Sequence, residues 1–121
     1  MTYTDIIERV DRLMPNAYTT EDKLKWLQEL DTTIWQEVFQ THENPDGYAL
    51  PDDAYTGEAL VPEPFAEDVY VSYLQANIAW HNEEDARYDR YITRFNDGYL
   101  RFARWYNEHY RPIPHGEYWR F

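Results

Sequence analysis

Residues 84–110, EDARYDRYITRFNDGYLRFARWYNEHY, place an apolar or aromatic side chain at every third or fourth position. The side chains that keep this spacing are Tyr88, Ile92, Phe95, Tyr99, Phe102 and Tyr106. The pattern predicts a helix from Glu84 to about Tyr110, which at ~1.5 Å per residue would be about 40 Å long. Gly98 lies inside this helix at a cost of about 1 kcal/mol relative to alanine. We therefore expect a bend, or a close approach of another helix, at Gly98.

Two segments near the N-terminus also have helical spacing. The first begins after a Thr2 cap and stops before Pro15, because a residue that precedes proline avoids helical geometry. The second opens at Thr19 or Thr20, continues with acidic residues in its first turn, and ends near His42.

A third segment begins after Pro62 and Pro64 and stops at a break at His81–Asn82. It carries two apolar stripes, one of Phe65, Val69, Tyr73, Ala76 and Trp80 and one of Tyr70, Leu74 and Ile78. A helix that is apolar around more than half of its circumference is buried on two sides. The sequence therefore predicts an all-α fold, a four-helix bundle with a long terminal helix.

Residues 43–64 form one long connection between the second and third helices, with four of the chain's seven prolines. A connection of more than ~15 residues in a small domain is commonly functional or disordered. Its apolar side chains favour an arm that lies on another surface, or a short hairpin. We expect one helical domain over residues 1–111, followed by a C-terminal tail over residues 112–121.

Composition excludes several classes of protein. The 121 residues include no cysteine, so disulfide frameworks, thiol catalysis and cysteine-ligated zinc are excluded. A net charge of −12 argues against sequence-independent nucleic-acid binding. No apolar run has the ~20 residues of a membrane span, and the N-terminus lacks the apolar core of a signal peptide. We expect a soluble protein made in a cytoplasm, with no membrane partner.

The residues do not indicate an enzyme, a metal site or a cofactor site. The sequence His81-Asn82-Glu83 resembles half of a zinc deaminase site, but the cysteine ligands of that site are missing. The other histidines lie at predicted helix ends or in the tail, and no phosphate-binding loop or nucleophile elbow is present.

Charge is divided unevenly along the chain. Residues 43–68 contain eight carboxylates and no lysine or arginine, whereas six of the nine arginines lie between residues 87 and 111. The spacing of Glu83 with Arg87, and of Asp97 with Arg101, fits local i, i+4 pairs. The alternative is a contact between subunits, in which the acidic arm of one copy meets the arginine face of the next. The candidate residues are Asp46, Asp52, Asp53, Glu58, Arg87, Arg90, Arg94, Arg101 and Arg104.

Aromatic residues are unusually abundant: the chain has 12 Tyr, 5 Trp and 5 Phe. The interior of a small domain cannot hold so many large rings. We therefore expect part of the surface to be buried against other chains. In the tail, Tyr118, Trp119 and Phe121 either fold back on the helices or dock on a partner, since such residues anchor interfaces.

Two stretches resemble small head-to-tail connector (adaptor) proteins of tailed double-stranded DNA bacteriophages and prophages. They are ERVDRLMPNAYTTEDKLKWLQELDTTIWQEV and YLQANIAWHNEEDARYDRYITRFNDGYLRFARWYNEHYRP. The resemblance implies a virion protein at the head–tail interface, assembled in the bacterial host as a ring, typically dodecameric, beneath the portal. The ring would extend the DNA channel without specific nucleic-acid binding, its arm would bridge adjacent subunits, and a terminal segment would dock on the portal or a downstream tail protein.

An acidic inhibitor that mimics DNA and blocks a host nuclease or restriction enzyme is the alternative class. It would share the small size, the helices and the negative charge. Its carboxylates should spread along an elongated face, however, whereas here they cluster around the arm.

Overall fold

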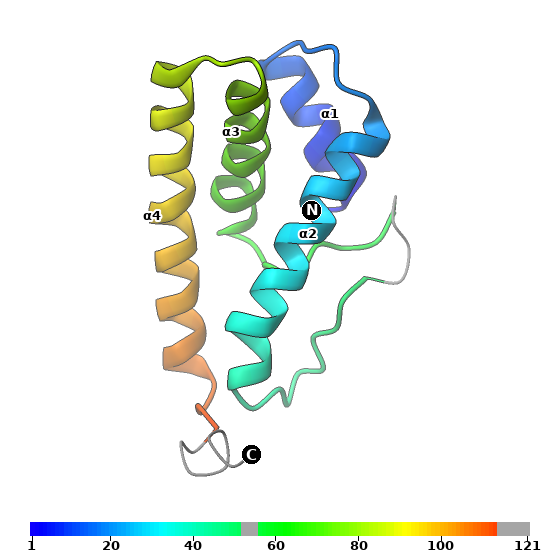
Figure 1. Cartoon of the computed structure of the whole chain (residues 1–121). Coiled ribbons are helices and arrows are strands. Elements are labelled where there is room, and N and C mark those ends of the chain that lie inside the picture. Colours follow the sequence, from blue (N-terminus) through cyan, green and yellow to red (C-terminus); the bar gives the residue numbers. More distant parts are fainter. Residues whose placement is uncertain (52–55, 114–121) are drawn as a thin grey trace, which may run out of the picture.

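The computed structural model of the chain describes residues 1–51 and 56–113. These residues form an all-helical fold, as predicted. Its four α-helices are α1 (Tyr3–Leu13), α2 (Thr20–Glu37), α3 (Ser72–His81) and α4 (Asp85–His109). Two short turns, η1 (Phe39–Thr41) and η2 (Glu67–Val71), follow α2 and precede α3. Figure 1 shows α3 between α4 on one side and α1 with α2 on the other.

The predicted helix starts near the N-terminus are confirmed. The side chain of Thr2 accepts a hydrogen bond from the backbone N–H of Asp5, whose carboxylate accepts one from Thr2 in return. The side chain of Thr19 caps α2 through the N–H of Asp22. These side-chain caps satisfy backbone N–H donors that the first turn of a helix leaves free, and the Thr2–Asp5 pair is reciprocal.

The end of α2 differs from the prediction. The α-helix stops at Glu37, and the chain tightens into the 3₁₀ turn η1 before His42. The Thr41 hydroxyl donates to the carbonyls of Glu37 and Val38, and the His42 ring also contacts the Val38 carbonyl. These side chains satisfy the carbonyls at the helix terminus, so the backbone can leave the α-helical path early.

The third helix is the centre of the core. Its first five residues, Glu67–Val71, form a π turn that runs directly into α3. Tyr70, Leu74 and Ile78 are fully buried. η2 and α3 pack against α1, α2 and α4, which confirms the prediction of a helix covered on more than one side.

α4 and η2 approach each other closely at Gly98. A Cβ atom at Gly98 would lie 2.9 Å from the Cβ of Asp68 and 3.3 Å from its carbonyl carbon. Real Cβ contacts are longer, so only glycine lets the two helices meet here. Of the two outcomes expected at Gly98, the close approach is the one the structure contains.

The aromatic stripe of α4 is covered unequally. Phe102 and Tyr106, in its C-terminal half, are fully buried against Phe39 and neighbouring rings. Tyr88 and Ile92, in its N-terminal half, belong to the same stripe but remain partly exposed. The C-terminal half therefore completes the core, while the N-terminal half leaves an open aromatic surface.

Both described ends of the arm pack on their own chain. Ala59, Leu60 and Val61 are buried, and Ala59 donates its N–H to the Met1 carbonyl at 3.0 Å. At the other end, Tyr48 packs its ring on Phe39. Residues 59–61 of the predicted arm are thus part of this domain's own core, and Tyr48 packs against it.

Candidate interaction surface

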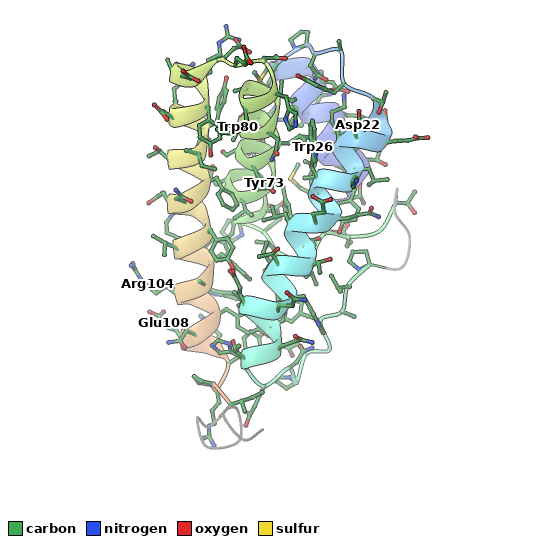
Figure 2. The ribbon with its side chains drawn as sticks, in the orientation of Figure 1. Asp22, Trp26, Tyr73, Trp80, Arg104 and Glu108 are labelled. Carbon is green, nitrogen blue, oxygen red and sulfur yellow. The ribbon has the colours of Figure 1, made fainter. Side chains whose placement is uncertain are left out.

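An aromatic groove lies between α3 and α4. It has a volume of about 250 Å³ and is lined by Tyr73, Ala76, Asn77 and Trp80 of α3 and by Tyr88 and Ile92 of α4. Figure 2 shows Tyr73 and Trp80 in the space between these two helices. Five of the six lining residues are apolar or aromatic, which suits a protein side chain better than a polar metabolite.

Trp80 is the most exposed ring of this groove. Its side chain is 64% exposed, and its ring lies 5.3 Å from the ring of Tyr88. Farther down the groove, Tyr73 packs on Phe95 with ring centroids 5.1 Å apart. A large exposed aromatic residue supported by packed neighbours is typical of an interface anchor.

A second hollow, with a volume of about 450 Å³, lies lower on α4. It is lined by Glu37, Phe95, Asn96, Tyr99 and Leu100. The Tyr99 hydroxyl donates to Oε2 of Glu37 at 2.6 Å and so ties α4 to the end of α2. Burial, together with the neighbouring carboxylate, raises the pKa of Tyr99, so this tyrosine stays protonated and acts as a donor.

Two carboxylates border the groove along α4. Asp85 and Asp89 lie on the same helical row as Ile92 and Asn96, which line the two hollows. Both are exposed, and neither carboxylate forms an ion pair within residues 1–51 and 56–113. The groove is therefore aromatic inside and negative along this edge.

The predicted arginine face occupies another row of α4. Arg94 and Arg101 both bind Asp68 of η2, at 3.1 and 2.6 Å, and Arg101 also pairs with Asp97 as predicted. Burial of Asp68 opposes its ionisation, but hydrogen bonds and charge from the two arginines outweigh this and lower its pKa. The acidic partner of these arginines is thus in their own chain.

The other three arginines on this face differ from one another. Arg87 pairs with Glu84 at 3.2 Å, so the prediction of Glu83 as its partner was wrong. Glu83 has φ of 59° and lies outside the helix, in the α3–α4 connection, where the i, i+4 rule does not apply. The guanidinium of Arg90 lies 5.5 Å from the ring of Tyr91. Arg104 is exposed and has no carboxylate partner among the described residues.

The acidic candidates of the arm are placed as follows. Asp46 accepts a hydrogen bond from the Tyr110 hydroxyl at 2.5 Å, and Glu58 pairs with the N-terminal ammonium group at 3.1 Å. Asp52 and Asp53 lie outside the described residues. No described acidic residue of the arm contacts an arginine side chain, so an arm-to-arginine contact between copies stays a prediction.

The tail candidates Tyr118, Trp119 and Phe121 lie outside the described residues. The described start of the tail pairs with η1, since Ile113 donates its N–H to the Thr41 carbonyl at 2.9 Å. Within residues 1–51 and 56–113, no group of three or more histidine or acidic residues could hold a metal ion. No helix in this part of the chain is long and apolar enough to cross a membrane.

Comparison with known proteins does not assign the chain to a family. No protein-family model matches the chain, and neither a curated protein nor a solved structure matches it. The case for function therefore depends on the surfaces described above.

Sequence reasoning missed the groove, although it named several residues in it. Trp80 and Tyr73 were assigned to an apolar stripe and expected in the core. The polar Asn77 on that stripe was the one local signal that the stripe meets solvent. The two carboxylates Asp85 and Asp89, near the start of α4, were also not identified from the sequence as interface candidates.

Proposed function

We propose that this chain is a structural subunit of a head–tail connector ring in a tailed bacteriophage or prophage. The observation that carries the proposal is the aromatic groove with its exposed Trp80, a surface that residues 1–51 and 56–113 leave uncovered. The chain combines this groove with a row of arginines on the same long helix. A ring subunit needs two such different surfaces, one for each neighbour.

The proposed role is structural and not catalytic. The subunits would assemble, typically twelve to a ring, beneath the portal and would extend the DNA channel. A surplus of negative charge suits such a channel, because it repels the phosphate backbone and does not retain the DNA. The portal and the next connector or tail protein would be the partners, with Tyr118, Trp119 and Phe121 as candidate docking residues.

Co-expression with the portal protein of the same phage or prophage tests the proposal. Electron microscopy of the purified complex should reveal an added ring of density on the narrow end of the portal. Particles released by phage induction should contain the chain in stoichiometric amount by mass spectrometry. A gene distant from any portal or capsid gene, or a pull-down that yields a nuclease and no virion protein, would contradict the proposal and favour the DNA-mimic inhibitor.

A further inference from the structure

α4 separates two surfaces of opposite charge. The stripe that packs on η2 and the rest of the core includes Gly98, Phe102 and Tyr106. On one side of this stripe, the helical row Asp85, Asp89, Ile92 and Asn96 borders the groove. On the other side lies the row Arg90, Arg94, Asp97, Arg101, Arg104 and Glu108. Figure 2 shows Arg104 and Glu108 on the outer side of α4, away from Trp80 and Tyr73.

Each row has charges that find no partner within the described part of the chain. Asp68 forms ion pairs with Arg94 and Arg101. Arg90 and Arg104 have no carboxylate partner in the described residues. In particular, Arg104 does not pair with Glu108, which lies one turn away. Asp85 and Asp89 likewise have no cationic partner in residues 1–51 and 56–113. Arg90 already lies against an aromatic ring, that of Tyr91, so a second ring would extend a contact it makes now.

We propose that the arginine row of one copy docks on the groove edge of the next, with Arg90 facing Trp80 and the carboxylates of Asp85 and Asp89. The partner is a second copy of this chain, and the contact is head-to-tail. This inference rests on the proposed ring function and names the surfaces that would build the ring. In place of the acidic arm, whose Asp46 and Glu58 carboxylates bind within their own chain, the proposed contact is built by α4 itself.

The heights along the helix agree with such a contact. Trp80 packs beside Tyr88, and Tyr73 beside Phe95, so the groove lies level with residues 88–95 of α4. Arg90 falls within that span, whereas Arg104 lies about 20 Å farther along the helix and outside this contact. Copies related by rotation about an axis parallel to α4 would therefore bring the two rows together without a shift. A head-to-tail contact of this kind closes into a ring when the rotation divides a full turn.

A cysteine pair tests the contact directly, since the natural chain has no cysteine. Asn77→Cys places a thiol in the groove, and Arg90→Cys places one on the opposite row. Under mild oxidation the double variant should form a ladder of covalent dimers, trimers and larger species on a non-reducing gel. The matched control combines Asn77→Cys with Glu8→Cys, an exposed position on α1. Cross-linking no stronger than in this control, with circular dichroism showing both variants folded, would overturn the proposal.

Charge reversal provides a second test with a built-in rescue. One variant carries Arg90→Glu, and the other carries Asp85→Arg and Asp89→Arg. Each alone opposes like charges across the contact, so its association, measured by sedimentation at high concentration, should fall at least tenfold. The mixture restores opposite charges at every contact and should associate again. Failure of the mixture to exceed either variant alone would reject the assigned surfaces.

These tests separate the contact from the wider function. If the chain binds a portal and forms a ring density, but the cysteine pair and the charge reversal have no effect, the connector role stands and this interface is wrong. If the ladder and the rescue appear but no portal binds, the contact between copies stands and the connector role fails.

Discussion

The Tyr70 hydroxyl donates a hydrogen bond to Oδ1 of the fully buried Asp31 and accepts one from the backbone N–H of Val61 at 2.8 Å. Oδ2 of Asp31 accepts two more, from the Tyr3 hydroxyl at 2.6 Å and the N–H of Leu60 at 3.2 Å. One carboxylate thus joins α1, α2 and η2 to the end of the arm. This network holds residues 60–61 in the core of the domain.

Removal of the Tyr70 hydroxyl should be costly. Tyr70→Phe leaves both Asp31 Oδ1 and the Val61 N–H without this partner in the core, so we expect a loss of roughly 3 kcal/mol in the free energy of unfolding. Tyr3→Phe is the matched control: Oδ2 still accepts from Leu60, and about 1 kcal/mol should be lost. Urea unfolding measures both. A loss in Tyr3→Phe as large as that in Tyr70→Phe would show that the bridge to Val61 contributes nothing.

The pKa values of two carboxylates predict opposite effects of pH on stability. Burial raises the pKa of Asp31, and its three hydrogen bonds only partly oppose this. The folded state therefore binds a proton more tightly than the unfolded state, and the Asp31 contribution should increase as pH falls toward the unfolded value of about 3.9. Asp31→Asn should remove this increase. If the difference in the free energy of unfolding between wild type and Asp31→Asn stays constant between pH 7 and pH 4, the raised pKa of Asp31 is contradicted.

Asp68 should act in the opposite direction and at lower pH. Its pKa is lowered, because the hydrogen bonds from Arg101 and Arg94 outweigh its partial burial. Its contribution is thus complete above the unfolded value of about 3.9 and is lost as pH falls through the lower folded value. Asp68→Asn should be less stable than wild type at pH 5, and the difference should shrink toward pH 3 in urea titrations. A difference that grows on acidification would be inconsistent with the Arg–Asp68 cluster.

Gly98→Ala tests the close approach of α4 to η2. Alanine is the better helix former by about 1 kcal/mol, so intrinsic propensity alone predicts a more stable protein. The added Cβ would lie 2.9 Å from Asp68, however, and relieving such overpacking typically costs about 1–3 kcal/mol. We expect net destabilisation in thermal melts. Ala86→Gly, at an exposed position of the same helix, calibrates the propensity term. Stabilisation by Gly98→Ala would mean that the helices can separate at little cost.

The helices were predictable because their signals are local. Thr2 and Thr19 cap helices through hydrogen bonds to residues three positions ahead, and the sequence contains every atom of those bonds. Asp97 and Arg101 pair for the same reason. The close approach of η2 to Gly98 was not predictable, because it joins two segments that are distant in the sequence.

The partners of the arginine face were beyond sequence reasoning. Asp68 lies 26 residues from Arg94 and 33 from Arg101, and only the α3–α4 hairpin brings them together. Periodicity likewise places Tyr88 and Tyr106 on one stripe, but it does not say how much of that stripe another helix covers. The groove exists because the core covers Tyr106 completely and Tyr88 only in part.

Trp80→Ala should separate folding from association. Because the Trp80 side chain is 64% exposed, its loss should change the free energy of unfolding by less than about 1 kcal/mol. Phe102→Ala, at a fully buried position, should instead cost about 3–5 kcal/mol. Trp80→Ala can also be introduced into the chain that carries Asn77→Cys and Arg90→Cys. If the groove receives the arginine row of another copy, this change should reduce cross-linking severalfold. The far-ultraviolet circular dichroism spectrum should stay unchanged. Unfolding on loss of Trp80 would place this ring in the core, and unchanged cross-linking would place the contact between copies elsewhere on the molecule.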